Sequence, residues 1–400
     1  MRFTFKHGLF SFLLVLASLM FSLVVAELGL RLADFSYYWP IARSPDPLTG
    51  WSAKPGTTGW QRLEGSAFVR INADGWRDIS HSLTPSTGHF RIAVLGDSFT
   101  EAVQVPLEKS YWRTLETLLP QCAPPAIKNK IEILGFGISG YSTAQELLVL
   151  ENRLWKYQPD LIILAFFTGN DLVENSRSLG KDDMRPYFNL QDGVLRQNRE
   201  FLQSQEYQSK SHGMGKLFFT ILTNSRLFQA FSLAKYQLQI GTKVVKQESA
   251  AGPTEPGVDV QIYKAPTTEQ WRSAWETTEA LINRMHVGIK KNQAKFLLVT
   301  LTNGAQVHPN PAFRAYFQQQ LQVPNLFYAD ERIRKLGLAS GFLVLNLAQD
   351  FQKFATKNGV WLHGFKNSTM GIGHWNEDGH LLAGQRIASF LCYNTELISK

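Results

Sequence analysis

From Phe90 onward, short apolar runs alternate with helical patterns along the chain. Five runs have the length and the bounding turn residues of buried strands, at 90–95, 131–134, 161–166, 295–300 and 343–347. Apolar residues at helical spacing follow at 111–119, 144–157, 268–291, 330–336 and 377–391. This alternation predicts an α/β fold in which a parallel, doubly wound sheet is covered by helices on both faces.

Two segments depart from the alternation. Residues 33–89 are rich in Gly, Pro, Trp and Ser, which predicts an N-terminal extension of turns and short strands. Residues 172–263, approximately, interrupt the domain that we expect over 90–400. They contain a predicted hairpin around Gln191-Asp192-Gly193, a helical stretch near 217–238 and a loop at 250–257. We interpret this interruption as a lid-like insertion.

The N-terminal segment 1–32 is predicted to be a membrane anchor or a signal segment. Residues 9–26 form an uncharged apolar run that is long enough to span a bilayer, and Arg2 and Lys6 precede it. Basic residues on that side place the N-terminus in the cytoplasm and the rest of the chain outside it. Cleavage near Ala26 would instead release a secreted protein, but the length of the run favours an anchor. Either way the globular part is expected to be extracytoplasmic, in a periplasm or outside the cell.

Charge and cysteine content exclude some classes of partner. The formal net charge of +8 comes without a basic run, so no nucleic-acid partner is expected. Cys122 and Cys392 are the two cysteines, and neither belongs to a C-x-x-C pair, which argues against a zinc ribbon or a redox motif. In an oxidising compartment they either form a disulfide or are buried separately. No metal or other cofactor is predicted, because the histidines near the C-terminus lack an H-E-x-x-H helix or a fitting cysteine.

Ser98 is the candidate nucleophile. It lies in Gly96-Asp97-Ser98, directly after the strand at 90–95, and ligands of parallel sheets bind beyond the carboxyl ends of strands. The alternative is an ordinary turn, since Gly, Asp and Ser all favour turns. A serine hydroxyl also needs a base to take its proton, and its acyl-transfer intermediate needs hydrogen-bond donors for the oxyanion.

Three other turns offer those groups. The glycine-rich turn at 135–143 contains Gly140 and would expose backbone N–H groups, although it also suits a plain strand-to-helix connection. Asn170 follows the third strand and carries a side-chain amide, in a sequence that equally suits a structural turn. His374 is the candidate general base, because imidazole titrates near neutral pH. His363 and His380 are interpreted as structural or binding residues.

In order and spacing, these four blocks resemble the SGNH (GDSL-like) hydrolase superfamily. The resemblance rests on Gly96-Asp97-Ser98, on Gly140, on Gly169-Asn170-Asp171 and on His374-Trp375-Asn376. It implies a three-layer α/β/α fold with a five-stranded, flavodoxin-like parallel sheet. It also implies that Ser98 is the nucleophile and that the N–H groups of Ser98 and Gly140, with the Asn170 side chain, form the oxyanion hole.

The chain departs from this family at one position. Family members usually carry an aspartate three residues before the base histidine, and Gly371 stands there. In a catalytic triad, that acid fixes the imidazole tautomer and stabilises the imidazolium. A backbone carbonyl or an acidic residue from elsewhere is expected to hold His374 instead. Glu377 and His380, at the same spacing, form the second-ranked acid and base pair.

The sequence therefore predicts an exported, membrane-tethered serine hydrolase that cleaves esters. The expected substrate carries O-acyl groups on a carbohydrate or another envelope component, because the domain lies outside the cytoplasm, is rich in aromatic residues and carries an insertion. One alternative is an O-acyltransferase that acts on surface polysaccharide. The other is a non-catalytic glycan-binding or scaffold protein, which the missing aspartate favours. No protein partner is indicated.

Overall fold

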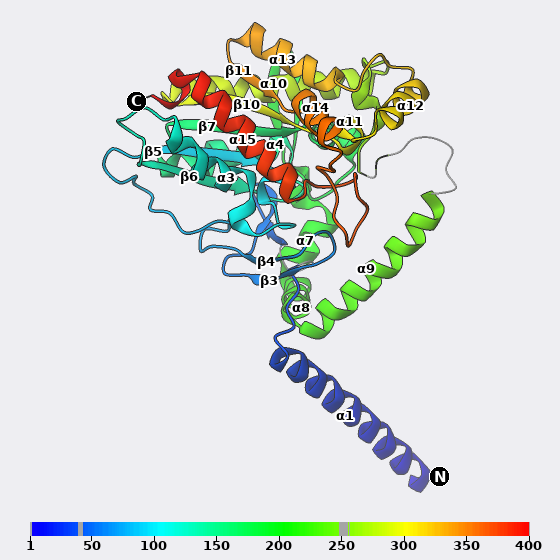
Figure 1. The fold of residues 1–400 in the computed structure, drawn as a ribbon. Helices are drawn as coiled ribbons and strands as arrows, with labels where there is room; N and C mark the ends of the chain where they lie inside the picture. The colour runs from blue at the N-terminus through cyan, green and yellow to red at the C-terminus, as the bar shows by residue number, and fades with distance from the viewer. Residues whose placement is uncertain (1, 39–42, 248–254, 256, 400) are drawn as a thin grey trace.

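A five-stranded parallel sheet lies at the centre of the computed structural model, which describes residues 2–38, 43–247, 255 and 257–399 (Figure 1). Its strands are β5 (Phe90–Gly96), β6 (Ile131–Gly137), β7 (Leu161–Phe167), β10 (Lys295–Leu301) and β11 (Leu343–Asn346). They follow the order β11-β10-β7-β5-β6, and every pair is parallel. The predicted parallel sheet is confirmed. From β5 the chain first adds β6 on one side and then β7, β10 and β11 on the other. Parallel sheets bind ligands at the crevice where the strand order reverses in this way, which here lies between β5 and β7.

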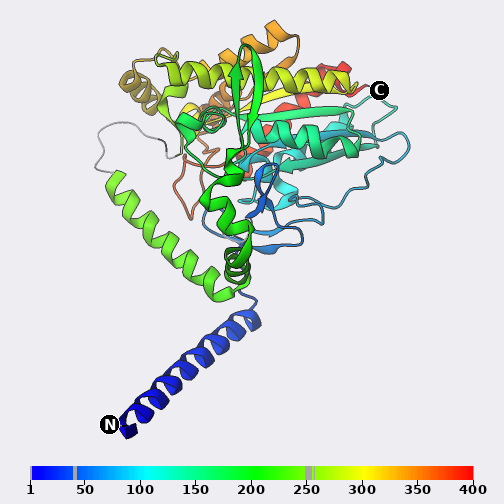
Figure 2. The same ribbon diagram turned by 180° about the vertical axis from the view of Figure 1, so that it is seen from behind.

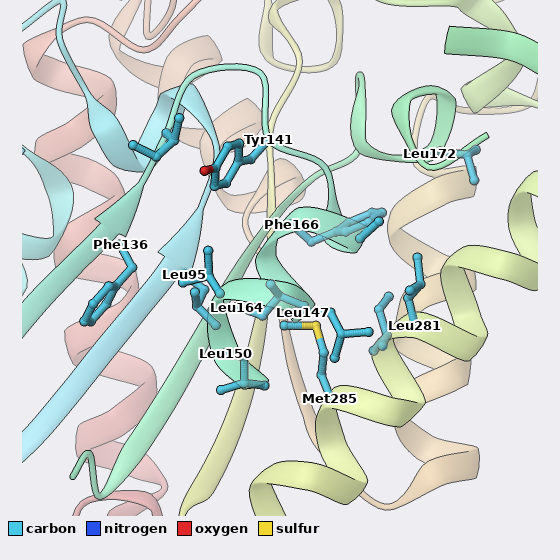
Figure 3. Close-up of a cluster of buried hydrophobic side chains, with 14 of the residues drawn as sticks. Leu95, Phe136, Tyr141, Leu147, Leu150, Leu164, Phe166, Leu172, Leu281 and Met285 are labelled. Atoms are coloured by element: carbon cyan, nitrogen blue, oxygen red, sulfur yellow. The ribbon is translucent and has the colours of Figure 1, made fainter. Parts of the chain in front are cut away.

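Helices cover both faces of the sheet (Figures 1 and 2). All residues of β5 and β7 are buried, and alternate side chains enter separate hydrophobic clusters. Ile92 and Ile163 pack with α3 (Tyr111–Leu118), α14 (Ala348–Asn358) and α15 (Glu377–Tyr393). Leu95 and Leu164 pack on the other face with α4 (Thr143–Val149), α10 (Glu269–Lys291) and α13 (Tyr328–Ser340), as Figure 3 shows in part. The fold is therefore the predicted three-layer α/β/α sandwich.

Several helices differ from the prediction. The helix expected at 144–157 is α-helical only in α4 and continues as a π-helical turn, η3 (Leu150–Leu154), and a 3-10 turn, η4 (Trp155–Tyr157). Helix α14, the short α11 (Gly304–Val307) and α12 (Pro311–Leu321) were not predicted. Asn310 begins α12 by accepting a hydrogen bond from the N–H of Ala312, and Pro311 occupies its first turn.

The N-terminal extension forms two antiparallel hairpins. β1 (Arg43–Asp46) pairs with β2 (Gly50–Ala53), and β3 (Thr58–Gln61) pairs with β4 (Ala67–Arg70). Trp51, Val69 and Trp76 are buried in the same hydrophobic cluster as Leu95 and Phe136 of the central sheet. The extension thus packs directly against the α/β sandwich and shares its core.

The insertion after β7 combines a hairpin with several helices. Its elements are α5 (Asp171–Glu174), α6 (Arg177–Gly180), β8 (Tyr187–Gln191), β9 (Val194–Asn198), η5 (Glu200–Gln203), α7 (Gln205–Ser211), α8 (Gly213–Asn224), α9 (Arg226–Gln247) and η6 (Val260–Tyr263). The helical stretch expected at 217–238 is thus two helices. They separate at Ser225, whose hydroxyl accepts from the N–H of Phe228 at the start of α9. Most of the loop expected at 250–257 lies outside the described residues.

The apolar N-terminus forms α1 (Arg2–Leu32), which projects away from the rest of the molecule in both views (Figures 1 and 2). Gly8–Leu32 is long and apolar enough to cross a membrane, and its side chains are not buried by the protein. The remaining short helices are α2 (Ser98–Glu101), η1 (Leu107–Lys109), η2 (Leu119–Gln121) and η7 (Thr395–Ile398). Cys122 and Cys392 form a disulfide that joins the end of η2 to α15, which settles the alternative left open by the sequence.

Candidate active site

Ser98 lies where β5 ends and α2 begins, beside the crevice of the sheet. Asp97 precedes it and caps α2, because its carboxylate accepts a hydrogen bond from the N–H of Phe99 at 2.9 Å. Asp97 is fully buried, whereas Ser98 is partly exposed. The Asp97 side chain thus holds the backbone of the turn, and the Ser98 side chain stays accessible.

The hydroxyl of Ser98 meets the imidazole of His374. Ser98 Oγ lies 2.8 Å from His374 Nε2, although 276 residues separate them in the chain. On the other side of the ring, His374 Nδ1 lies 2.6 Å from Glu64 Oε2. A carboxylate only accepts hydrogen bonds, so Nδ1 carries the proton and Nε2 is free to accept one from Ser98. Ser98, His374 and Glu64 therefore form a continuous hydrogen-bonded chain with triad geometry.

Glu64 is the functional candidate that the sequence did not identify. It lies in the loop between β3 and β4, and its Oε1 also accepts from the backbone N–H of His374 at 2.7 Å. The carboxylate thus holds both the ring and the backbone of the histidine. The only sequence signal for such a residue was the missing aspartate at 371, which indicated that an acid or a carbonyl must come from elsewhere.

An aspartate at position 371 would be strained in this loop. Its φ of +83° is one that residues with a side chain rarely adopt. A Cβ atom there would also lie 2.3 Å from the ring of Trp361. The backbone of this loop thus disfavours an aspartate at position 371, and the carboxylate that contacts His374 is that of Glu64, in the N-terminal extension.

Asn367 fixes the loop that carries Glu64. Its side-chain oxygen accepts from the N–H of Gly65 at 3.0 Å, and its amide nitrogen donates to the carbonyls of Arg62 and Gly65 at 3.1 and 2.7 Å. Gly65 has a φ of +71°, and a Cβ atom there would lie 2.1 Å from the carbonyl oxygen of Gln104. The Glu64 loop is therefore packed between two segments of the chain: that of Gln104, which follows Ser98, and that of Asn367, which precedes His374.

Electrostatics favour the charged pair of Glu64 and His374. Burial opposes the protonated form of His374, but the charge and hydrogen bond of Glu64, together with the charges of Asp97 and Glu101, raise the pKa of His374 above its usual value. Burial likewise opposes the carboxylate form of Glu64, yet its interactions with His374 lower the pKa of Glu64. Glu64 is therefore poised to stabilise an imidazolium at position 374.

Two backbone N–H groups beside Ser98 are available as donors. Within the described residues, the N–H groups of Ser98 and Gly140 make no hydrogen bond. Arg43 and Arg185 donate to the carbonyl oxygens of Ser139 and Gly140, each at 2.8 Å, and so fix the orientation of this turn. Gly140 has a φ of +75°, and a side chain there would contact Arg43. The turn is thus held in a conformation that leaves the Gly140 N–H unpaired.

Asn170 lies at the end of β7 and is partly exposed. It lies near the buried carboxyl of Asp97, whose pKa burial raises to about 6. A side-chain amide carries two N–H donors. Asn170 does not line the cavity that holds Ser98, Gly140 and His374. The structure therefore brings three of the four predicted site residues, Ser98, Gly140 and His374, to one cavity, and the fourth does not line it.

The cavity has a volume of about 300 Å³. Its wall includes residues of the N-terminal extension as well as of the α/β sandwich: Tyr38, Arg43, Ala53, Gln61, Leu63, Glu64, Ser98, Glu101, Val103, Gln104, Ile138, Ser139, Gly140 and His374. Among the described residues, no group of three or more His, Cys, Asp or Glu side chains is arranged to hold a metal ion.

His363 lies under the loop that carries His374. Its Nδ1 donates to the carbonyl of Gly373 at 2.7 Å, so its Nε2 accepts from the Thr302 hydroxyl at the same distance. Burial lowers the pKa of His363 to about 4, which keeps the ring neutral. This histidine therefore holds the loop, in line with the structural role considered from the sequence.

The second-ranked pair of Glu377 and His380 does not form. His380 is fully buried, stacks on the ring of Tyr111, and has no hydrogen-bond partner among the described residues. Burial lowers the pKa of His380 to about 3. Glu377 instead accepts from Lys109 at 2.5 Å on the surface. His380 is a packing residue at the start of α15.

The chain is similar in structure to SGNH (GDSL-like) esterases. The acetyl xylan esterase AlAXEase is 16% identical, with a TM-score of 0.38 over 76% of this chain and 100% of that one. An acetylxylan esterase from Geobacillus stearothermophilus is 12% identical, with a TM-score of 0.36 over 77% and 94% of the two chains. A GDSL-like lipase from Bacteroides thetaiotaomicron is 13% identical, with a TM-score of 0.34 over 78% and 91%. No protein-family model and no curated protein sequence matches the chain.

Proposed function

We propose that this protein is an SGNH-type serine esterase. The observation that carries the proposal is the hydrogen-bonded chain from Ser98 through His374 to Glu64, which opens onto a cavity of about 300 Å³. A non-catalytic binding protein was favoured by the missing acid at position 371. The contact of Glu64 with His374 Nδ1 at 2.6 Å supports an acid in this site despite the glycine at position 371.

The arrangement supports a two-step acyl transfer. His374 Nε2 takes the proton of Ser98 as Oγ bonds to the ester carbonyl carbon, and Glu64 stabilises the imidazolium. The N–H groups of Ser98 and Gly140 donate to the oxyanion, with the Asn170 amide as the proposed third donor. The carbon–oxygen bond of the ester then breaks, and His374 gives its proton to the leaving alcohol. Water repeats the sequence on the acyl-enzyme and releases the acid.

The proposed substrate is an ester with an acyl group on a carbohydrate or another envelope component. Ala53, Leu63, Val103 and Ile138 give the cavity apolar walls, which suit the hydrocarbon part of an acyl group. We further propose that α1 anchors the protein and that the catalytic domain lies outside the cytoplasm. If a sugar hydroxyl takes the place of water on the acyl-enzyme, the same residues catalyse O-acyl transfer.

An active-site serine probe tests this function on the full-length protein. A fluorophosphonate should label the wild type and Ser178→Ala, whose serine is exposed in the insertion, but should not label Ser98→Ala. Hydrolysis of p-nitrophenyl acetate should follow the same pattern. Failure of the folded wild-type protein to react with either reagent would contradict the proposal. Product analysis with an acetylated oligosaccharide and an unacetylated acceptor then separates hydrolysis from transfer.

A further inference from the structure

The end of α1 is joined to both long helices of the insertion. The carboxylate of Glu27 accepts from the Ser225 hydroxyl at 3.0 Å and from the N–H groups of Arg226 and Leu227 at 3.0 and 2.9 Å. It therefore caps the N-terminus of α9, where a negative charge is favourable. Arg31 donates to the carbonyl of Asn224 at 2.9 Å, at the C-terminal end of α8. The apolar helix is thus tied to the junction of α8 and α9.

Helix α8 presents an apolar stripe that the protein does not cover. Met214, Leu217, Phe218 and Ile221 follow the spacing i, i+3, i+4 and i+7, and their exposed fractions are 79%, 53%, 64% and 58%. On α9, Phe231 is 67% exposed. Single exposed apolar residues are ordinary, but a continuous stripe of this kind marks an interaction surface.

The same segment carries only positive charge. Residues 207–247 contain no Asp or Glu, and their basic residues are Lys210, Lys216, Arg226, Lys235, Lys243 and Lys246. Helices that combine an apolar stripe with basic residues lie in the interface of a bilayer, and basic residues favour anionic lipids. This combination favours a lipid surface over a protein partner.

An apolar groove connects the stripe to the membrane-spanning helix. It is lined by Met20, Leu23 and Val24 of α1 and by Ile221, Phe228 and Phe231 of α8 and α9, among others. In both views α9 runs across the direction of α1 rather than along it (Figures 1 and 2). If α1 spans a bilayer, α9 therefore extends beside the surface of that bilayer.

A polar cavity of about 250 Å³ lies at the same junction. Arg31, Lys54 and Arg226 line it, together with threonine hydroxyls and backbone, and no acidic side chain does. Arg31 pairs with Glu27, but Lys54 and Arg226 contact only the side-chain amide oxygens of Asn224 and Gln229, both at 3.0 Å. Lys54 and Arg226 thus have no carboxylate partner among the described residues, and threonine hydroxyls lie beside them. Such a site suits a phosphate group.

We propose that α8 and α9 dock on the extracytoplasmic leaflet beside α1, and that this polar cavity binds the phosphate of an anionic phospholipid headgroup. The cavity includes Arg31, which lies at the extracytoplasmic end of the apolar span and hence at headgroup depth. The α8 stripe enters the upper acyl region. The catalytic domain is then held at the membrane by two attachments rather than by a single helix.

Depth measurements on spin-labelled full-length protein in nanodiscs test the docking. A label at Phe218→Cys should be relaxed more by oxygen than by a water-soluble nickel chelate. A label at Lys216→Cys, on the opposite side of the same helix, should show the reverse. Cys122 and Cys392 are paired and do not take the label. Equal nickel access at both positions would overturn the proposal.

Native mass spectrometry of the detergent-solubilised full chain tests the headgroup site. Phosphatidylglycerol should bind in preference to phosphatidylcholine, and Lys54→Gln combined with Arg226→Gln should weaken its binding about tenfold. Lys353→Gln combined with Lys357→Gln, which removes two exposed lysines of α14, should bind as the wild type does. Hydrolysis of a soluble ester reports that each variant is folded. Equal binding of both lipids, or full competition by millimolar inorganic phosphate, would overturn the assignment.

Discussion

Glu64 contacts His374 twice, through the ring Nδ1 at 2.6 Å and through the backbone N–H at 2.7 Å, across 310 residues of sequence. One carboxylate therefore sets both the position of the histidine backbone and the tautomer of its ring. Because Glu64 belongs to the N-terminal extension, the candidate site is assembled from two parts of the chain that the sequence pattern separates. The extension is thus part of the catalytic machinery that we propose, and not only a connection to α1.

Glu64→Gln should lower kcat/KM for an ester substrate by about 10³ to 10⁴, because a neutral amide no longer fixes the tautomer or stabilises the imidazolium. Steady-state hydrolysis of p-nitrophenyl acetate measures this loss. Glu108→Gln, which changes an exposed carboxylate in η1, should retain wild-type activity. Full activity of Glu64→Gln would mean that another group orients His374.

The pH dependence of kcat/KM should report His374. A general base acts in its neutral form, so activity should fall as the pH is lowered through the raised pKa of His374. Removing the charge of Glu64 removes the main interaction that raises this pKa. The acidic limb of the residual activity of Glu64→Gln should therefore move to lower pH. An acidic limb at the same pH in both proteins would assign it to a different group.

The sheet could be predicted because burial of its strands leaves a direct mark on the sequence. β5 and β7 are buried on both faces, so their apolar runs are continuous and easily recognised. Ser98 and Gly140 follow strands, and the parallel sheet brings the ends of these strands together. Helix α14 was missed because only Ala348, Phe351 and Ala355 of it are buried, which gives a weak periodic pattern.

The contact of Glu64 could not be predicted in the same way. It depends on how the β3–β4 loop packs against the loop of His374, and that packing is made by Asn367 and by close backbone approaches at Gly65 and Gly373. None of these contacts leaves a periodic signal or a short motif in the sequence. The departure at Gly371 showed that an acid was missing but gave no indication of its source.

Gly371→Asp should not restore activity to Glu64→Gln. The left-handed backbone and the clash with Trp361 should lower the free energy of unfolding by about 2 kcal/mol or more. Chemical denaturation measures this loss. Gly193→Asp separates the two causes, because Gly193 has a similar φ of +74° but open space around its Cβ position. Gly371→Asp should therefore lose more stability than Gly193→Asp. An equal loss of unfolding free energy in the two variants would show that the contact with Trp361 adds nothing to the cost of the backbone.

Asn367→Ala should lower kcat about tenfold with a smaller change in KM. Asn367 is a positioning residue, since it acts through the Glu64 loop and does not reach Ser98. The variant should also shift the acidic limb of the pH profile in the same direction as Glu64→Gln, which a general loss of stability would not do. Asn358→Ala, at the exposed end of α14, is the matched control. An unchanged pH profile in Asn367→Ala would show that Asn367 does not orient Glu64.

The disulfide between Cys122 and Cys392 should stabilise the folded protein without contributing to catalysis. It closes a segment of 270 residues and joins η2 to α15, and neither cysteine lines the active-site cavity. A long closed loop loses more conformational entropy in the unfolded chain, so replacing both cysteines with serine should lower the free energy of unfolding by about 2 to 5 kcal/mol. Chemical denaturation of the oxidised wild type and the double variant measures this difference. At temperatures where both are folded, their kcat/KM values should agree, and a large loss of activity in the folded variant would show that the disulfide also positions α15 and the His374 loop.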